Sequence, residues 1–360
     1  MNNNKLTIAP AWLFQSEQGD LLEPTLFRLL AGIRDTGKLT DAARRTGISY
    51  RHGWNLLNRA GEVFGLSLVN MRKGRGTTLS ELGETLLWAE HRVKARLGPQ
   101  LDSMAAELNG QIQHLRANAE TVLRLHASHG YAVALLTEFN DQLSVNLQYR
   151  NPEEALSALN RGDCDVASLH FPTDPALAQD TLAHYHHLLA GRPLRLIRFV
   201  TRSEGLMMRP DTTPPVRHLT DLVKRQLRFI GRDHHSGTRV LFNRLLQHQG
   251  LAEADLNLSP QQEFTHTAVA AFVAAGMADV GFGVEAAAAQ FGLRYRQLAR
   301  EHYLLVCHQD RLEQPGLTRL RALMTSEAVV ARIGQVPGYQ PDRPGEVTTF
   351  EALLGESPSG

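Results

Sequence analysis

Residues 39–64, from Leu39 to Phe64, read LTDAARRTGISYRHGWNLLNRAGEVF. The pattern predicts two short helices separated by a turn at Gly47, with Ser49 as the N-cap of the second helix. Ala42 and Ala43 are small enough to let a neighbouring helix cross closely. The stretch therefore predicts a helix-turn-helix, a shape that places one helix in the DNA major groove.

The second helix of this pair has two different faces. Helical spacing predicts an apolar, buried side made of Trp54, Leu57, Gly61 and Phe64. The opposite stripe carries donors and cations without any acid: Arg51, His52, Asn55, Asn58 and Arg59. A merely solvated face usually mixes Glu with Lys, so the absence of acids favours a DNA-reading face over an ordinary amphipathic helix.

The flanking segments extend this unit to residues 1–79. Leu26–Ile33 (LFRLLAGI) predicts a third helix, and Leu68–Leu79 (LVNMRKGRGTTL) predicts two β segments around a basic turn, which is a candidate wing. The DNA-binding residues predicted from these elements are Thr40, Ser49, Tyr50, Arg51, His52, Asn55, Asn58, Arg59, Arg72, Lys73 and Arg75.

Charge is distributed unevenly along the chain. Of 360 residues, 38 are Lys or Arg and 37 are Asp or Glu, giving a formal net charge of +1. Residues 26–100 hold 13 Lys and Arg against 6 Asp and Glu, so this region carries +7 and the remainder carries −6. The basic end of the chain is the one with the helix-turn-helix pattern, as binding to a polyanion requires.

Composition and cysteine usage indicate an intracellular globular protein of two or three domains. Cys164 and Cys307 lie in apolar contexts without metal-ligand spacing, which predicts two buried free thiols. The start of the chain lacks a signal-peptide core, and no apolar run reaches membrane-spanning length. We expect a cytoplasmic protein with no membrane partner.

Residues 80–117 predict a long linker helix. Apolar residues recur at steps of three and four from Leu82 to Leu115, and Gly98-Pro99 is expected to kink or split the helix. The stripe needs a partner. We favour the same stripe of a second copy, which gives a homodimer or homotetramer, because DNA-binding proteins commonly pair to match two half-sites. The alternative is that the stripe packs on its own domain.

Beyond residue 118, short apolar runs alternate with helical stretches, which is typical of an α/β domain over residues 118–340. A Pro- and Gly-rich C-terminal tail is predicted for residues 341–360. The strands are expected at 122–125, 144–147, 166–169, 194–200, 206–208, 227–230, 280–282 and 303–307. The helices are expected at 132–139, 152–160, 176–189, 219–224, 238–249, 267–275, 284–291 and 317–326.

Three strand-to-helix junctions in this domain carry small, donor-rich loops. Each places hydroxyls and backbone N–H groups at a helix N-terminus, where an anion is stabilised. Ser and Thr before helices are usually plain N-caps, so a ligand site requires the three loops to converge. The loops are Ser128-His129-Gly130, Ser236-Gly237-Thr238-Arg239 and Thr265-His266-Thr267.

Two other chemistries are weighed against this anion site. Asp233, His234, His235 and Ser236 contain the residue types of a hydrolase triad, but adjacent residues in one loop rarely reach that geometry. The run of His184, His186 and His187 places imidazoles around a helix rather than on one face, with no further ligand at metal spacing. We therefore predict no catalytic residues, no metal and no resident cofactor.

The first domain resembles the winged-helix DNA-binding domain of molybdate-responsive and LysR-type bacterial regulators. The resemblance rests on GKLTDAARRTGISYRHGWNLLN and on LVNMRKGRGTTLSELGETLL, with KGRG as a short version of the family's glycine-rich wing.

The second half resembles periplasmic-binding-protein-like effector domains related to molybdate and tungstate receptors. Its pieces include ASHGYAVALL, NRGDCDVASLHF, SGTR and AAGMADVGFG. The resemblance implies two lobes, with the chain crossing near Thr201 and Arg296. It also implies hydroxyl contacts to an oxyanion from Ser128, Ser236 and Thr238. His170 and Arg239 are further candidates for the site.

Together these observations predict a multidomain, ligand-responsive bacterial transcription regulator: a winged helix-turn-helix, a linker helix that dimerises, and a two-lobed α/β sensor. An anion that binds one lobe arrangement better would shift the spacing of the DNA-reading helices. Molybdate or tungstate is the favoured effector, with an organic metabolite or the molybdenum cofactor as the alternative. The controlled genes would then serve molybdenum or tungsten uptake or molybdoenzymes. A cytoplasmic anion-binding or storage protein, whose first domain contacts protein, is the competing class.

Overall fold

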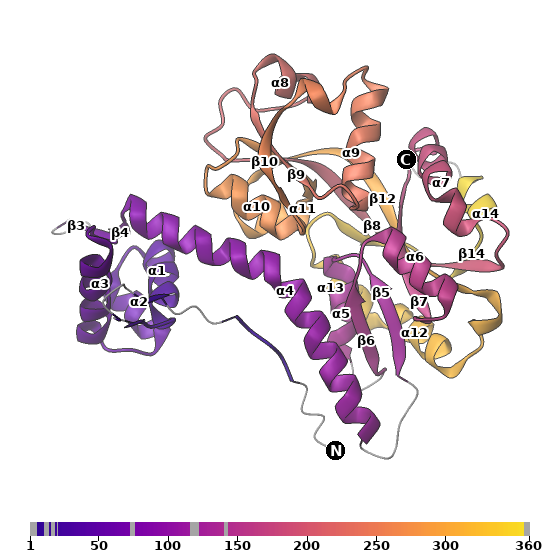
Figure 1. Cartoon of the computed structure of the whole chain (residues 1–360), viewed down its shortest axis with the longest axis horizontal. Helices are drawn as coiled ribbons and strands as arrows, with labels where there is room; N and C mark the ends of the chain where they lie inside the picture. Colours follow the sequence, from indigo (N-terminus) through magenta and orange to yellow (C-terminus); the bar gives the residue numbers. More distant parts are fainter. Residues whose placement is uncertain are drawn as a thin grey trace. The chain divides into compact units, whose positions relative to one another are not determined.

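The computed structural model describes residues 6–10, 14, 15, 19, 21–72, 76–115, 122–139 and 143–355 (Figure 1). The chain divides into two compact units. One comprises Ala9–Gly98, and the other comprises Met1–Ile8 with Pro99–Gly360. Each unit is described by itself below.

Three helices form most of the first unit: α1 (Thr25–Thr36), α2 (Leu39–Thr46) and α3 (Tyr50–Phe64). Gly47 has a φ of +76°, and the Ser49 hydroxyl accepts a hydrogen bond from the His52 N–H at 3.1 Å. A Cβ built on Gly32 would lie 3.1 Å from the Cα of Ala42, so α1 and α2 do cross closely. The predicted helices, turn and N-cap are confirmed.

The buried face of α3 differs from the predicted one. Its buried residues are Gly53, Leu56, Leu57 and Ala60, whereas the side chain of Trp54 is 36% exposed. The prediction that Trp54 is buried is therefore wrong. The core that receives α3 comes from Leu26 to Ile33 of α1 and the two small alanines of α2, and it is filled without the indole.

Two small hairpins complete the first unit. β1 (Phe14–Gln15) pairs with β2 (Leu21–Leu22), and β3 (Val69–Arg72) pairs with β4 (Gly76–Leu79), both antiparallel. The second hairpin occupies the segment predicted as a wing. Lys73 and Arg75, which the sequence predicts for the turn of this wing, lie outside the described residues.

The linker segment is one continuous helix, α4 (Glu81–Leu115), which contains Pro99 within it. Gly98-Pro99 does not split the helix, so that half of the prediction is wrong, and a kink at this point stays a prediction. The boundary between the two units falls here. Along the predicted apolar stripe, Leu86 is buried, whereas Leu97, Met104 and Leu108 are exposed by 37%, 59% and 41%.

One sheet of ten strands organises the second unit. The strand order along its main path is β10-β9-β11-β8-β12-β7-β5-β6, with β13 and β14 pairing with β8. The strands are β5 (Leu123–Ala127), β6 (Val145–Tyr149), β7 (Val166–Pro172), β8 (Leu194–Met208), β9 (Arg228–Arg232), β10 (Asn257–Glu263), β11 (Val280–Val284), β12 (Arg294–His308), β13 (Tyr339–Pro341) and β14 (Val347–Thr348).

Helices cover this sheet, and most begin where the sequence places a capping residue. Asn151 and Glu154, for example, form a reciprocal capping box at the start of α6. The helices are α5 (Tyr131–Leu136), α6 (Pro152–Arg161), α7 (Pro175–Leu189), α8 (Leu219–Lys224), α9 (Gly237–His248), α10 (His266–Ala274), α11 (Glu285–Gln290), α12 (Pro315–Thr325), α13 (Glu327–Gly334) and α14 (Phe350–Leu354). Short 3-10 turns lie at η1 (Thr137–Phe139), η2 (Glu253–Asp255) and η3 (Gln309–Arg311).

The long antiparallel strands β8 and β12 divide the sheet into two lobes (Figure 1). The first lobe contains β5, β6 and β7, and the second contains β9, β10 and β11. The two strands predicted at 194–200 and 206–208 are one strand, because the polar residues between them are paired rather than looped out. In the register, Thr201 faces His302 and Arg202 faces Glu301, so the predicted crossing near Thr201 falls in mid-strand.

The segment after residue 337 is part of the domain rather than a tail. Both β13 and β14 pair with β8, and the Asp342 carboxylate accepts bonds from Arg198 Nη2 at 2.7 and 2.9 Å. His302 Nδ1 lies 2.7 Å from the same carboxylate. The predicted C-terminal tail is therefore wrong for residues 341–355; residues 356–360 lie outside the described part.

Both cysteines are buried and unbonded to each other, as predicted. Among the helices of the described residues, none combines the length and apolarity needed to cross a membrane.

Candidate functional site

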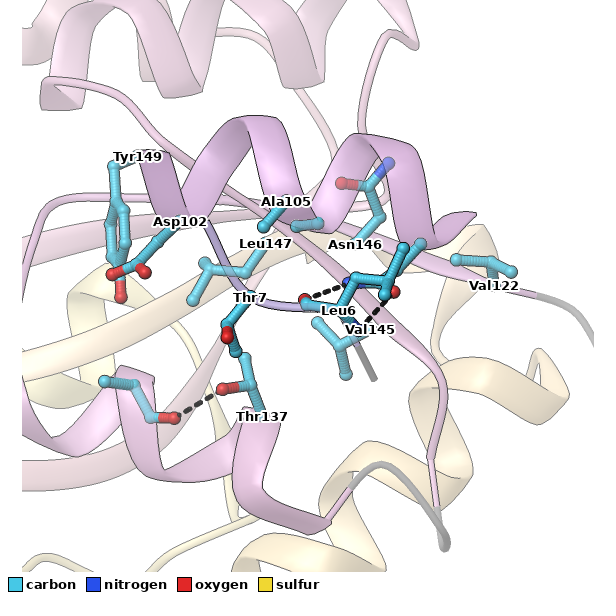
Figure 2. A pocket seen from close by; sticks show the side chains of 13 residues that line it. Leu6, Thr7, Asp102, Ala105, Val122, Thr137, Val145, Asn146, Leu147 and Tyr149 are labelled. Carbon is cyan, nitrogen blue, oxygen red and sulfur yellow. Dashed lines mark hydrogen bonds between the residues drawn. The ribbon is translucent and has the colours of Figure 1, made fainter. Parts of the chain in front are cut away.

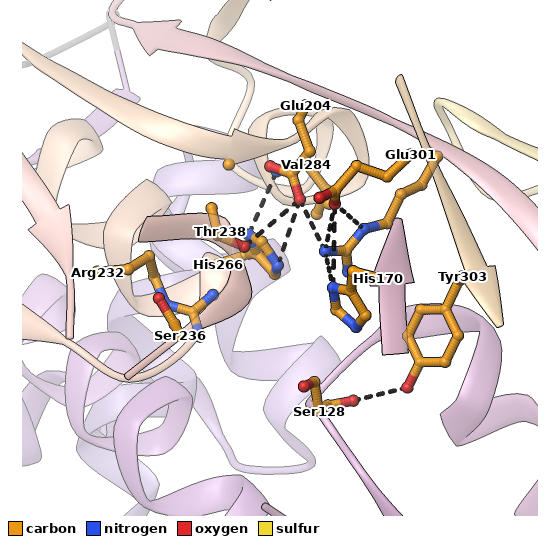
Figure 3. Close-up of polar contacts among 12 residues, drawn as sticks. Ser128, His170, Glu204, Arg232, Ser236, Thr238, His266, Val284, Glu301 and Tyr303 are labelled. Atoms are coloured by element: carbon orange, nitrogen blue, oxygen red, sulfur yellow. Dashed lines mark hydrogen bonds and ion pairs between the residues drawn. The ribbon is translucent and has the colours of Figure 1, made fainter. Parts of the chain in front are cut away.

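A cluster of polar side chains, most of them buried, lies where the two lobes meet on the crossover strands (Figure 3). We call it the interlobe cluster. The first lobe supplies the 128–129 loop and β7, the second lobe supplies β9 and the starts of α9 and α10, and β8 and β12 supply the ions between them. Its members are Ser128, His129, His170, Arg202, Glu204, Arg232, Ser236, Thr238, His266, Glu301 and Tyr303.

Arg202 is the central ion of the interlobe cluster and is fully buried. Its guanidinium donates to the Glu301 carboxylate at 2.8 and 3.1 Å, and its Nη2 lies 2.9 Å from Glu204 Oε1. Burial opposes this charge, but the two carboxylates outweigh it and raise the pKa of Arg202. Burial raises the pKa of Glu204 despite Arg202, so the stable ion pair is Arg202 with Glu301.

Two histidines have their tautomers fixed by their neighbours. Arg202 Nη2 can only donate to His170 Nδ1, which leaves the His170 proton on Nε2. That Nε2 is buried and has no partner among the described residues.

The Val284 N–H lies 3.4 Å from His266 Nδ1, so His266 carries its proton on Nε2, 3.9 Å from Glu204 Oε1. Burial, reinforced by Arg202 and Arg232, holds the pKa of both histidines well below the usual range, and both are neutral donors at pH 7.

The loop of Ser128 and His129 faces the cluster from the first lobe. The Ser128 carbonyl accepts a bond from the Tyr303 hydroxyl at 2.9 Å, and its N–H donates to Ser168 Oγ at 2.8 Å. The hydroxyl of Ser128 and Nδ1 of His129 are buried without a described partner. Burial lowers the pKa of His129 to about 4, so its ring is neutral. Gly130 is needed because a Cβ there would lie 3.0 Å from the Tyr303 ring.

Arg232, at the carboxyl end of β9, supplies a cation from the second lobe and is 8% exposed. Its Nη2 donates to the Phe264 carbonyl at 2.8 Å, while Nε and Nη1 have no partner among the described residues. Burial lowers the pKa of Arg232 to about 10, so it stays charged at neutral pH. A buried cation with unpaired donors is costly unless an anion compensates it.

The predicted SGTR loop begins α9, but its four residues do different things. Ser236 is an N-cap: it accepts from the Arg239 N–H at 3.2 Å and donates to the Asp233 carbonyl at 2.9 Å. Thr238 Oγ1 lies 3.5 Å from Glu204 Oε1, inside the cluster. The Arg239 guanidinium is paired with Glu253 and the Arg232 carbonyl, so it is held away from the predicted ligand role.

Two further predicted residues lie at the seam between the lobes. A Cβ on Gly237 would be 3.8 Å from His170 Nδ1, so α9 begins directly against the first lobe. Thr267 Oγ1 is 3.0 Å from the Tyr131 hydroxyl, which joins α10 to α5. The third loop therefore contributes His266 to the cluster, while Thr265 caps α10 and Thr267 joins the lobes.

The alternative chemistries do not assemble in the described structure. The Ser236 hydroxyl is bound to backbone groups, and His234 contacts Gln262 at 2.7 Å, so no nucleophile–base pair forms in this loop. His184 lies 3.7 Å from Glu153. Across the described residues, no group of three or more His, Cys, Asp and Glu side chains could hold a metal ion.

In the first unit, the predicted stripe of α3 is exposed to solvent along its length. Arg51, His52, Asn55, Asn58 and Arg59 are all exposed, together with Thr40, Ser49 and Tyr50. His52 Nε2 lies 3.8 Å from the Glu23 carboxylate, which brings one acid to the edge of the stripe. Arg72 ends β3.

Sequence reasoning missed the ions of the interlobe cluster: Arg202, Glu204, Arg232 and Glu301. Each is a charged residue within a strand, and in the sequence it looks like an ordinary polar interruption of that strand. The ion pair of Arg202 with Glu301 joins residues about a hundred positions apart. A usable signal was present in TRSEG (201–205), where charged residues interrupt an apolar run whose flanks both predict strand.

Comparison with known proteins places the α/β unit in a family. Residues 133–325 match the family model of the PBP superfamily domain. The uncharacterized protein YvgK of Bacillus subtilis (strain 168) is 28% identical over 200 residues, which are 56% of this chain and 64% of that protein. The chain thus spans slightly less than two thirds of the length of this curated relative.

Solved structures with partial likeness include full-length HypT from Salmonella typhimurium, a hypochlorite-specific LysR-type transcriptional regulator. It has 16% identity, a TM-score of 0.45, and coverage of 85% of this chain and 98% of that chain. Hydrogen-peroxide-bound OxyR from Corynebacterium glutamicum has 16% identity, a TM-score of 0.44, and coverage of 86% and 95%. Because the family model covers more than half of its residues, the chain belongs to the family defined by the PBP superfamily domain.

Proposed function

We propose that this protein is a ligand-responsive transcription regulator that binds promoter DNA through α3 and senses a small anion at the interlobe cluster. The observation that carries the proposal is the exposed stripe from Arg51 to Arg59 of α3, which contains no acid, in the same chain as a PBP-family domain. A helix that begins with an exposed Tyr50 and Arg51, and continues through Asn55 and Arg59, offers base contacts first and phosphate contacts a turn later.

The DNA-binding half is tested by Arg51→Ala. Removing this guanidinium should weaken binding to a fragment of the protein's own promoter by about 1–3 kcal/mol and relax base preference at one position. The measurement is fluorescence anisotropy across a salt series, since phosphate contacts give a salt-dependent affinity. Arg28→Ala removes a charge from α1 that is also exposed, and should leave affinity unchanged.

Failure of this test has a defined meaning. If the wild-type protein shows no salt-dependent affinity for any fragment of its promoter, the proposal of a transcription regulator is contradicted. The alternative, an anion-binding or storage protein, then remains. Equal losses for Arg51→Ala and Arg28→Ala would remove α3 as the reading helix.

For the effector, we propose a small oxyanion, with molybdate or tungstate favoured. The cluster offers mainly donors: the Arg232 Nε and Nη1, the His170 Nε2–H and the Ser128 hydroxyl, all without described partners. The N-terminus of α9, twelve residues long, adds backbone N–H groups beside them. A set of buried donors around one unpaired cation is complementary to a compact anion.

Thermal-shift measurements with molybdate, tungstate, sulfate, phosphate and small carboxylates test this site. Binding to the folded state adds about 2.7 kcal/mol of stability at a hundredfold excess over Kd. Arg232→Gln and Thr238→Ala should reduce the shift, whereas Arg244→Gln on the outer part of α9 should not. A full shift in Arg232→Gln would exclude this cluster; a shift by carboxylates alone would replace the oxyanion by an organic effector.

We further propose that the protein pairs through α4. Met104 and Leu108, one turn apart, are exposed by 59% and 41%, which is unusual for apolar residues on a long helix without a partner. Met104→Lys should shift the protein to the monomer in light scattering. A dimer that survives this change would place the pairing surface elsewhere.

A further inference from the structure

A cavity separate from the interlobe cluster is bordered by cations. It has a volume of about 410 Å³ and lies between the loop after β8 and the start of β12. Arg217, His218, Arg294 and Arg296 line it, and Met208 and Val216 supply apolar surface. None of these residues belongs to the interlobe cluster.

The arginines of this cavity are not neutralised by neighbouring acids. Within the described structure, no carboxylate forms an ion pair with Arg217, Arg294 or Arg296. Asp221, in the first turn of α8, uses Oδ2 to accept hydrogen bonds from the backbone N–H groups of Arg217 and His218 at 2.9 and 3.0 Å. Asp211 is paired with Arg209 instead, at 3.3 Å.

The cavity is also held in shape by its own residues. Arg294 donates to the carbonyls of Pro210 and Thr212 at 2.8 and 3.3 Å, which fastens the loop over the start of β12. Tyr295, on the same strand, donates its hydroxyl to the Gly283 carbonyl at 3.3 Å. Gly283 precedes Val284, whose N–H fixes His266, so the wall of this cavity connects to the interlobe cluster through two hydrogen bonds.

We propose that this cavity is a second ligand site, which takes a small molecule with two or more negative charges and an apolar body. Arginine favours phosphate and carboxylate groups because its planar fork donates two parallel bonds. The volume is within the range of small-molecule sites, and the apolar residues offer contact for the uncharged part of the ligand.

Titration of the full-length protein with inorganic pyrophosphate and with citrate tests this site. Calorimetry measures affinity, and hydrogen exchange localises the bound probe. We expect protection of residues 209–218 and 291–298. In Arg217→Gln/Arg296→Gln, whose side chains are exposed, we expect roughly tenfold weaker binding and loss of that protection. Tighter binding of pyrophosphate would assign a phosphorylated ligand, and tighter binding of citrate would assign a polycarboxylate.

A matched control separates this site from general charge effects. Arg161→Gln/Arg192→Gln removes two exposed charges from the first lobe and should keep wild-type affinity and protection. Arg232→Gln should also keep protection at 209–218, because it alters only the interlobe cluster. The proposal is overturned if neither probe protects these segments at about 10 mM. Equal weakening in the control, or unchanged binding in Arg217→Gln/Arg296→Gln, overturns it as well.

Discussion

The α3 face and the interlobe cluster use similar residues in opposite ways. On α3, Arg51, Asn55 and Asn58 are exposed and follow one another at helical spacing. In the interlobe cluster, Arg202, Glu301 and His170 are buried and come from three different strands. Exposed cations cost the fold little and are available to a polyanion, whereas buried ions must be paired to be tolerated. Substitutions should therefore affect binding on α3 and stability in the cluster.

The part of α4 that belongs to the α/β unit gives another comparison with the α3 face, because its residues line a cavity. The stripe of α3 is exposed to water. In the α/β unit, by contrast, Asp102 and Ala105 of α4 line a cavity together with Leu6 and Thr7 (Figure 2). The Asn109 side chain accepts a hydrogen bond from the Leu6 N–H at 2.9 Å and donates one to the Leu6 carbonyl at 2.8 Å.

The largest effect is expected from Arg202→Met. It leaves Glu301 and Glu204 buried without their cation, which should lower the free energy of unfolding by about 3–5 kcal/mol. Burial already raises the pKa of Glu204, and loss of the Arg202 charge should raise it further. The folded state then binds this proton more strongly than the unfolded state, so the deficit should grow as pH rises. Urea unfolding at acidic and neutral pH measures both. Arg300→Met is the control, because the partners of Arg300 include the neutral Thr201 and Gln340. Its free energy of unfolding should fall far less.

An intermediate effect is expected from Asp342→Asn, in the segment that sequence predicted as a tail. Burial raises the pKa of Asp342, but the bonds from His302 and Arg198 outweigh it and lower the pKa overall. Ionised Asp342 therefore contributes to the free energy of unfolding fully above the pKa of the unfolded state, near 4. This contribution is lost as pH falls through the lower pKa of the folded state. We expect a loss of about 1–3 kcal/mol at pH 7 that shrinks at lower pH. The exposed Asp310→Asn should be neutral, and a pH-independent loss would contradict this account.

The contrast also explains how much the sequence could predict. Helices α1 to α3 and the Ser49 cap were predictable because each depends on residues a few positions apart. The exposure of Trp54 was not predictable, since it depends on how α3 packs on α1 and α2. Gly53 and Leu56 face that core, and the indole does not. The loops of Ser128 and Thr238 were predictable as helix starts, but their convergence required the sheet order.

Four strands, β8, β10, β13 and β14, were missed or predicted with the wrong bounds, for physical reasons that differ. β8 reads as two strands because Arg202 and Glu204 interrupt it, and only the distant Glu301 makes them tolerable there. β10 contains Pro260 and several polar residues, which is acceptable because it is the edge strand of the sheet. β13 and β14 are too short to have a pattern of their own and exist only by pairing with β8.

The smallest effect should come from the two serine caps, which test the contrast with one kind of substitution. Ser49→Ala removes a single exposed bond to the His52 N–H and should cost about 1 kcal/mol, with Ser49→Asn restoring most of it. Ser236→Ala removes a buried hydroxyl that both accepts from Arg239 and donates to Asp233, so two backbone groups lose a partner that water cannot replace. Its cost should exceed that of Ser49→Ala in chemical denaturation. Equal costs would mean that the α9 loop is as open to solvent as α3, and that its donors are not held for a buried anion.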